Sequence, residues 1–427
     1  MINLLDRARN SNLFRAFSLS MMVAILSRLA TLGMAIILAR ELGPIGYGAF
    51  IFALGIAKLC SQISCLGWPM LMSKFVPKYQ VENEWGLLSG LIRNANVVVG
   101  GSSVTCALIL YFCAKGNFLD AQVSQGVLLA VVILPALSML TLRRSQLASQ
   151  KKPAKGLFFS EFFSPTMIVV ASFLFPINEV RPAFYLFAGF SYLSFLIATV
   201  ATRQGWSRQI QSVPSESKLK EWMLFSLPLI AAVSGKMIMS KADIIMLAPL
   251  SSMEEVGYYG AVFRITYLLT FSQVVLMTVL SPLFSEAISQ ENFELLRKRF
   301  RIAIIAALLF SLPFGAVVLI FKVQIVTLLY GQEYLQGVPA LIYLVCSQTA
   351  ATINMPLSSL MIMSGRQKAY GAITVIALIV NLLLNWFLIP IKGAEGAAIA
   401  TMTASSIIAI LSLIFCWSIL RSYAEMR

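Results

Sequence analysis

Long apolar runs, separated by short polar or basic stretches, follow one another along the chain from residue 16 onward. Each run has about 20 residues or more, which is the length an α-helix needs to cross the hydrocarbon core of a bilayer. The pattern predicts membrane-spanning helices at residues 16–39, 47–72, 91–114, 121–142, 157–176, 182–202, 222–248, 257–283, 302–321, 337–363, 369–390 and 396–420. The predicted fold is therefore an all-α integral membrane protein with about twelve transmembrane helices.

The composition agrees with this pattern and excludes several kinds of chemistry. Of the 427 residues, 59% are hydrophobic and only 12% are charged, whereas soluble domains carry about 25% charged residues. A water-soluble enzyme and a nucleic-acid-binding protein are excluded on this ground. The chain has no histidine, so a histidine general base and a histidine-ligated zinc site are excluded too. Its six cysteines form no CxxC pair, and we expect neither a metal nor a cofactor.

The lysines and arginines are distributed unequally over the two sides of the predicted membrane segment. If the N-terminus is cytoplasmic, 23 of the 33 lie on the cytoplasmic side, 5 on the opposite side and 5 within spans. Because cytoplasmic loops carry the excess of basic residues, this asymmetry predicts that both termini are cytoplasmic and that the number of spans is even. The predicted outer loops are too short for a catalytic domain, so we expect that the protein is not an enzyme.

The longest polar connection follows the sixth predicted span and divides the chain into halves. We expect an N-terminal six-helix lobe at residues 1–205, a cytoplasmic linker at 206–220 and a C-terminal six-helix lobe at 221–427. A short repeat supports the division, because Ile45-Gly46-Tyr47 resembles Val256-Gly257-Tyr258. Two halves with six spans each have the same orientation, which predicts a parallel pseudo-twofold axis along the membrane normal.

Charged side chains inside the predicted spans are the first candidates for function. Six ionisable residues fall well within spans, namely Arg28, Lys58, Lys236, Lys241, Asp243 and Arg264. A lysine or arginine near the bilayer centre costs about 2.5–3.5 kcal/mol on insertion scales, so five such cations need water, partners or a ligand. We interpret the five cations as substrate-binding residues of a hydrated cavity that selects an anion. Asp243 is the candidate for coupling transport to H+ or Na+.

Asp243 has a second interpretation. Lys236, Ser240 and Asp243 are spaced i, i+4 and i+7 and share one face of the seventh span, which we expect to face a water-filled cleft. A buried salt bridge of Asp243 with Lys236, Arg28 or Arg264 is the structural alternative.

Three other polar positions near span ends have both a functional and a structural interpretation. Tyr258 and Tyr259 could stack on sugars, but tyrosine at a span end is more often an interfacial anchor. Glu161 begins the fifth span near Lys155 and is interpreted as a boundary residue.

Three motifs resemble those of a known family. They are the run from Asn381 to Thr401, with Pro390, Gly393 and Gly396-Ala397-Ala398; Gly43-Pro44-Ile45-Gly46-Tyr47-Gly48; and Val256-Gly257-Tyr258-Tyr259. With them the chain resembles Wzx-type O-antigen flippases of the multidrug/oligosaccharidyl-lipid/polysaccharide exporter superfamily. The resemblance implies a V-shaped pair of six-helix lobes in the bacterial cytoplasmic (inner) membrane. It also implies transport of an undecaprenyl-pyrophosphate-linked oligosaccharide, such as the O-antigen unit of lipopolysaccharide, from the inner to the outer leaflet.

The resemblance also implies roles for particular residues. In related lipid II flippases, basic residues of spans one, two and eight line the central cavity, and Arg28, Lys58 and Arg264 are their counterparts by position. The chain departs from these relatives because Leu29, not an acidic residue, follows Arg28. That difference, and twelve spans instead of fourteen, argue against lipid II as the substrate. The implied partners are an anionic lipid-linked oligosaccharide, membrane lipids, a coupling H+ or Na+ and other polysaccharide-assembly proteins, with no nucleic acid.

Two alternative functions remain open at this point. A cation-coupled drug exporter of the same superfamily would share the fold, but five cations in the cavity would repel cationic drugs. A membrane glycosyltransferase or polysaccharide polymerase would need catalytic loops outside the membrane, and the predicted outer loops are too short for them.

Overall fold

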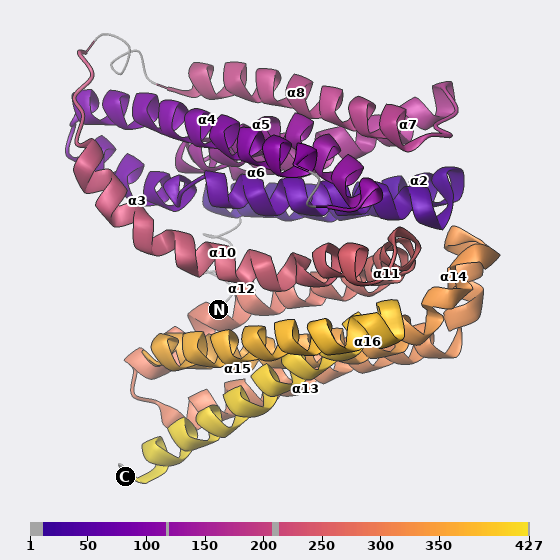
Figure 1. Ribbon diagram of the computed structural model, residues 1–427. Helices are drawn as coiled ribbons and strands as arrows, with labels where there is room; N and C mark the ends of the chain where they lie inside the picture. The colour runs from indigo at the N-terminus through magenta and orange to yellow at the C-terminus, as the bar shows by residue number, and fades with distance from the viewer. Residues whose placement is uncertain (1–11, 117–118, 207–212, 426–427) are drawn as a thin grey trace. The chain divides into compact units, whose positions relative to one another are not determined.

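The computed structural model describes residues 12–116, 119–206 and 213–425. The side chains of 12–17, 227–237, 268, 270–272, 274–279, 281 and 422–425 are outside this description. Within the described ranges every regular element is a helix (Figure 1). Helices satisfy their backbone hydrogen bonds internally, which an apolar segment in lipid requires. The all-α class predicted from the apolar runs is confirmed.

The chain forms two compact units, Met1–Lys241 and Ala242–Arg427. The division falls inside α10 (Leu219–Leu250), so one helix contributes to both units. The predicted linker at residues 206–220 lies before this division, and the lobe boundaries given from the sequence stay a prediction.

The first unit is assembled around α5, which packs against α2, α4, α8, α3 and α6. Its elements are α2 (Asn12–Ser64), α3 (Trp68–Val81), α4 (Trp85–Lys115), α5 (Ala121–Ser149), α6 (Pro153–Leu157), the π-helical turn η1 (Phe158–Phe162), α7 (Phe163–Leu174) and α8 (Val180–Gly205).

The first turn of α10 is anchored in this unit. Trp222 packs edge-on against Trp68 with ring centroids 6.4 Å apart. Its indole Nε1 donates a hydrogen bond to the hydroxyl of Tyr79 at 3.0 Å. Both tryptophans are fully buried, so the start of α10 belongs to the core of the first unit.

The second unit is assembled around α15, which packs against α16, α13, α12 and α11. Its elements after α10 are α11 (Met253–Thr266), the 3-10 turn η2 (Tyr267–Leu269), α12 (Thr270–Ser289), α13 (Phe293–Ile320), α14 (Lys322–Tyr330), the 3-10 turn η3 (Gln332–Gly337), α15 (Val338–Met363) and α16 (Gln367–Glu425).

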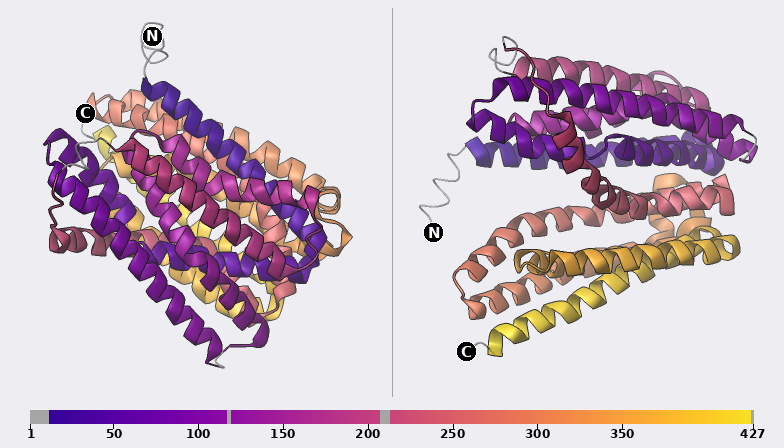
Figure 2. Two further views of the ribbon diagram at one scale, coloured as in Figure 1. Left: turned by 90° about the horizontal axis from the view of Figure 1, so that it is seen from above. Right: turned by 60° about the vertical axis from the view of Figure 1, so that its left-hand side comes forward.

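Two glycines divide the longest helices into pairs of segments. Gly43 in α2 has φ +64° and Gly393 in α16 has φ +53°, values that glycine adopts more readily than other residues. The 53-residue α2 extends no further than the 31-residue α4 in Figure 1, because its two segments lie side by side. Figure 2 shows the two segments of α16 close together near the turn and diverging toward the C-terminus.

Several predicted spans differ in detail from the helices. Within the described residues, 8 helices are long and apolar enough to cross a membrane, and the longest two contain the turns at Gly43 and Gly393. The predicted span 47–72 is interrupted at Gly67, which has φ +74° and precedes α3. The predicted span 257–283 is broken by η2. Hydropathy does not register such local turns inside apolar sequence, and the number of twelve spans stays a prediction.

Candidate functional site

The turn of α16 is held by a carboxylate of α11. Glu255 follows the N-cap Ser252, whose hydroxyl accepts the Glu255 N–H at 3.2 Å and begins α11. The Glu255 carboxylate accepts a hydrogen bond from the backbone N–H of Ala394 at 2.7 Å, directly after Gly393. A Cβ at Gly396 would lie 2.4 Å from the carbonyl oxygen of Leu388. The two segments of α16 therefore approach as closely as a glycine contact allows.

This close approach builds a polar cluster around Asp243, inside the second unit. The Asp243 side chain, on α10, is 6% exposed. It accepts hydrogen bonds from the hydroxyl of Tyr259 on α11, from Thr401 Oγ1 at 2.5 Å and from Asn385 Nδ2 at 2.8 Å. Asn385 and Thr401 lie on the two sides of the Gly393 turn, and Asn381 contacts both of them, at 3.3 and 3.4 Å. We call these five residues the Asp243 cluster.

Among the described residues, the Asp243 carboxylate accepts hydrogen bonds from neutral groups. None of the ion pairs among the described residues includes Asp243, so the salt-bridge alternative is not seen with any described cation. Asn385 Oδ1 is buried and has no hydrogen-bond partner in the described part of the chain. The cluster thus combines one carboxylate with amide and hydroxyl oxygens. Oxygen donors of this kind suit a small hard cation, and one negative charge matches a proton or a monovalent ion.

The orientation of Asp243 differs from the sequence-based interpretation. We expected its face of the helix to line a water-filled cleft, but the side chain is buried against α11 and α16. Tyr259 is 1% exposed, and its hydroxyl donates a hydrogen bond to the Asp243 carboxylate. Tyr258 is 7% exposed, and its hydroxyl donates to the Glu254 carboxylate at 2.5 Å. Neither tyrosine presents a free ring face for stacking on a sugar.

The predicted substrate-binding cations are distributed over both units. Arg28 and Lys58 lie on the two segments of α2, each 15 residues from Gly43. At 1.5 Å of rise per residue both lie about 22 Å from the turn, so the structure brings them to one level of the unit. Both are half-buried.

The remaining predicted cations lie on α10 and α11. Lys241, at the end of the first unit, and Arg264 on α11 are half-buried. Neither contributes a hydrogen bond to the Asp243 cluster. Lys236 is in the part of α10 whose side chains lie outside the described residues. The assignment of all five cations to the substrate stays a prediction.

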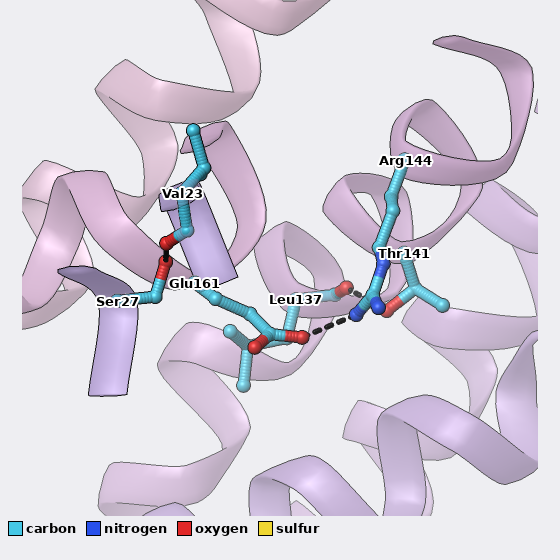
Figure 3. A network of polar contacts seen from close by, with 6 residues as sticks. All are labelled: Val23, Ser27, Leu137, Thr141, Arg144 and Glu161. Carbon is cyan, nitrogen blue, oxygen red and sulfur yellow. Dashed lines mark hydrogen bonds and ion pairs between the residues drawn. The ribbon is translucent and has the colours of Figure 1, made fainter. Parts of the chain in front are cut away.

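Glu161, interpreted from the sequence as a boundary residue, forms an ion pair with an arginine of another helix. It lies on η1, a π-helical turn that widens the helix between α6 and α7. Its carboxylate pairs with Arg144 on α5 and not with Lys155 (Figure 3). Nearby, the hydroxyl of Ser27 on α2 donates to its own helix backbone (Figure 3). Glu161 therefore joins two helices of the first unit in a half-exposed ion pair.

The model of one protein family matches most of the chain. The family is described as "Polysaccharide biosynthesis protein", and its model matches residues 13–288. The chain belongs to this polysaccharide biosynthesis family. The family resemblance stated from the sequence is confirmed. A second model, MatE, matches residues 228–387.

A curated relative of this family member is a probable low-salt glycan biosynthesis flippase of Haloferax volcanii. It is 24% identical over 225 residues, and the match spans 52% of this chain and 47% of the relative. The chain thus aligns with about half the length of this relative.

Solved structures of transporters share the fold of this family member. An inward-facing multidrug resistance MATE family transporter of the MOP superfamily has a TM-score of 0.75 at 14% identity, covering 93% of this chain and 96% of its own. The lipid II flippase MurJ, in an inward closed conformation, has a TM-score of 0.72 at 17% identity, covering 92% and 86%. These relatives are flippases and transporters, which supports the prediction that the chain is not an enzyme. The polysaccharide biosynthesis family member is a multi-pass membrane protein.

Three members of the Asp243 cluster were not identified as site residues from the sequence. Asn381, Asn385 and Thr401 all fall in the run that indicated the family, but that run was interpreted as a packing motif. Two asparagines spaced i, i+4 in an otherwise apolar span are a visible signal, because they place two amides on one helix face. Polar side chains inside a membrane helix are costly, and they commonly mark functional sites.

Proposed function

We propose that this protein is a flippase that moves an undecaprenyl-pyrophosphate-linked oligosaccharide from the inner to the outer leaflet of a bacterial cytoplasmic membrane. The oligosaccharide is an O-antigen or another surface polysaccharide unit. Membership of the polysaccharide biosynthesis family and the flippase relative support this function. The Asp243 cluster is the single observation that carries its mechanism, because a buried carboxylate among neutral oxygens is a site for a coupling cation.

The basic residues of the proposed site suit the anionic end of this substrate. Arg28, Lys58, Lys241 and Arg264 are half-buried, and together with Lys236 they would hold the pyrophosphate by charge-assisted hydrogen bonds. Binding of the pyrophosphate offsets the cost of cations at membrane depth. The glycan would follow the headgroup while the polyprenyl tail stays in lipid.

The Asp243 cluster would couple this movement to an ion gradient. The N-terminal end of α10 is anchored by Trp222 in the first unit, and its C-terminal part is held by Asp243 in the second. A proton or Na+ at Asp243 competes with the hydrogen bonds from Tyr259, Asn385 and Thr401. Its arrival therefore changes how firmly α10 is tied to α11 and α16, and an ion that binds one state better shifts the population toward that state.

The membrane potential would add to the driving force. Moving one negative charge outward across an inside-negative membrane gains about 2.3 kcal/mol per 100 mV. A pyrophosphate with about two charges gains roughly twice that energy, so net outward transport is favoured even with a weak ion gradient.

Genetic complementation tests the proposed substrate class. Deletion of the gene should remove the surface glycan and cause its lipid-linked precursor to accumulate in the inner leaflet. Arg28→Ala, Lys58→Ala and Arg264→Ala should each fail to restore the glycan at normal protein levels. If all three variants restore it fully, the assignment of these cations to the pyrophosphate is wrong.

A drug exporter of the same superfamily is the second candidate function. The MatE match at residues 228–387 and the MATE transporter with a TM-score of 0.75 favour it. Efflux of ethidium-like dyes from cells that produce the protein separates the two functions. The flippase proposal predicts no efflux above that of vector-only cells.

A further inference from the structure

The first unit contains a buried cation that the proposed transport function does not use. Arg143 on α5 is 7% exposed. None of the ion pairs among the described residues includes it, whereas the next residue, Arg144, pairs with Glu161. A buried charge without a counter-charge is costly unless nearby dipoles or a ligand stabilise it.

Neutral oxygens from three helices hold the Arg143 guanidinium. Its Nε donates to Thr199 Oγ1 on α8 at 3.0 Å. Its Nη1 donates to Asn96 Oδ1 on α4 and to Gln146 Oε1 on α5, both at 2.7 Å. These contacts fix the guanidinium plane, and the Phe195 ring of α8 lies under the guanidinium, with its centroid 5.6 Å from Cζ. In the described part of the chain, no carboxylate forms an ion pair with this positive charge.

Two hydrogen-bond donors remain unused at this position. Nη2 of Arg143 forms none of the three hydrogen bonds that hold the guanidinium. Gln146 Nε2 is buried and has no partner in the described part of the chain. An oriented cation beside an unsatisfied amide donor matches the acceptor oxygens of an anion, and an arginine fork suits the geometry of phosphate.

The surroundings indicate that this anion belongs to a lipid. Arg203 lies four residues after Thr199 on the same face of α8 and adds a second positive charge near Arg143. Beside the polar contacts, Val97 on α4 and Val200 on α8 are 66% and 55% exposed. Exposed valines next to two cations can contact the acyl chains of a lipid whose charged headgroup binds the cations. A soluble phosphate has no apolar part that could contact the valines.

The depth of Arg143 also fits a headgroup. Arg143 precedes the end of α5 at Ser149 by six residues, and Thr199 precedes the end of α8 at Gly205 by six residues. Six residues correspond to about 9 Å of helix, which places the guanidinium near one end of the unit. The distribution of basic residues predicts that this end is cytoplasmic. Figure 1 shows α4 and α8 on one side of the first unit and α2, which carries Arg28 and Lys58, on the other, with α5 between them.

We infer that Arg143, Gln146 and Arg203 form a binding site for the phosphate of an anionic phospholipid headgroup, between α4 and α8. Nη2 of Arg143 and Nε2 of Gln146 donate to the phosphate oxygens, and the acyl chains lie along Val97 and Val200. The bound lipid joins α4, α5 and α8 and is not transported. This site is independent of the proposed flippase activity, because none of its residues is assigned to the substrate.

Native mass spectrometry of the purified full-length protein tests the site. The protein is exchanged into detergent with phosphatidylglycerol, with phosphatidylcholine or with inorganic phosphate. Phosphatidylglycerol should be retained about fivefold more strongly than phosphatidylcholine, because the choline cation is repelled by Arg143 and Arg203. Inorganic phosphate at millimolar concentration should neither bind at this position nor displace the lipid.

Matched variants locate the retained lipid. Arg143→Gln should lose most of the preference for phosphatidylglycerol, and Arg203→Gln should lose part of it. Arg144→Gln, which removes a neighbouring arginine on another face of α5, should keep it in full.

Specific results would overturn the proposal. Equal retention of the two lipids by the unmodified protein would do so, as would an unchanged preference in Arg143→Gln. Displacement of the lipid by inorganic phosphate would assign the site to a soluble anion instead. If Arg143→Gln does not elute as a folded protein in gel filtration, the lipid preference of the unmodified protein and of Arg203→Gln decides the question.

Discussion

The two units each bury one charge among neutral groups, and the charges have opposite sign. Arg143 in the first unit is 7% exposed and donates to three neutral oxygens. Asp243 in the second unit is 6% exposed and accepts from three neutral donors. In both places protein dipoles replace the water that the charge has lost, and none of the ion pairs among the described residues includes the charge.

The difference between the two positions lies in what surrounds the charge. Asp243 is enclosed by α10, α11 and both segments of α16, so only a small ion can reach it. Arg143 contacts α4 and α8, where Val97 and Val200 are exposed, and this apolar surface suits the larger amphipathic anion proposed above. In the two proposed sites, the sign of the buried charge would select the sign of the ligand, and the packing around the charge would select the size of the ligand.

The largest effect is expected for Asp243→Asn. The substitution keeps the shape of the side chain and removes the charge, so ion-dependent transport should fall by about tenfold or more, the factor that corresponds to about 1.4 kcal/mol. Thermal stability should be unchanged or higher, because the variant removes a buried charge that forms no ion pair with the described residues. Glycan transport and the unfolding temperature are measured on the same preparations.

Glu395→Gln is the matched control for Asp243→Asn. Glu395 lies on α16 but pairs with Lys392 at 3.1 Å near the surface, so transport should remain normal. A large loss of stability in Asp243→Asn without a specific loss of ion dependence would assign Asp243 a structural role.

The next effect concerns the close approach within α16. In Gly396→Ala the new methyl group would lie 2.4 Å from the carbonyl oxygen of Leu388. Separation of the two segments should lower the free energy of unfolding by about 1–3 kcal/mol, as overpacking does, and should weaken the contacts of Asp243 with Asn385 and Thr401. Gly371→Ala, on the same helix with open space around it, should be neutral or slightly stabilising. Equal unfolding temperatures for the two variants would contradict the proposed geometry.

A smaller effect is expected for Tyr259→Phe. The variant loses the hydroxyl that orients the Asp243 carboxylate, and the loss of one such hydrogen bond costs about 1 kcal/mol. Because an arriving ion competes with this hydrogen bond, the ion concentration for half-maximal transport should fall about fivefold while the maximal rate changes less. Tyr258→Phe removes the hydroxyl of the neighbouring tyrosine, which bonds to Glu254, and should leave the ion dependence unchanged. An equal change of the half-maximal ion concentration in both variants would show that the Tyr259 hydroxyl has no specific role at the ion site.

The smallest effect is expected for the Arg144 and Glu161 pair. Both side chains are 45% exposed, and ion pairs with such exposure contribute about 0–1 kcal/mol. In a double-mutant cycle with Arg144→Gln and Glu161→Gln, we expect a coupling energy below about 1 kcal/mol. A much larger coupling energy would mean that the first unit relies on the Arg144–Glu161 ion pair and not only on the buried Arg143.

The sequence allowed the fold class and some site residues to be predicted. Apolar runs of membrane length specify helices, because a single segment in lipid can form all its backbone hydrogen bonds internally only as a helix. Asp243 could be identified because a carboxylate in an apolar span is conspicuous. Its partners Asn385 and Thr401 could not be assigned, because their placement depends on the Gly393 turn and on Glu255, which contacts that turn from a distant part of the chain.

Local geometry explains the other differences between prediction and structure. The π-helical turn at Phe158–Phe162 changes the register of side chains around the helix. The contact between Glu161 and Arg144 therefore does not follow from helical periodicity. Arg143 was counted only among the cytoplasmic basic residues, because its burial results from the packing of α4 and α8 against α5.

The most direct test of the central claim is flipping of a polyprenyl-pyrophosphate-linked oligosaccharide by the purified protein in proteoliposomes. The outer-leaflet fraction is measured by its accessibility to an added glycosidase, with and without an imposed Na+ or proton gradient. We predict gradient-dependent flipping by the unmodified protein and its loss in Asp243→Asn. Flipping no faster than in protein-free liposomes, or flipping by Asp243→Asn that responds equally to the gradient, would contradict the claim.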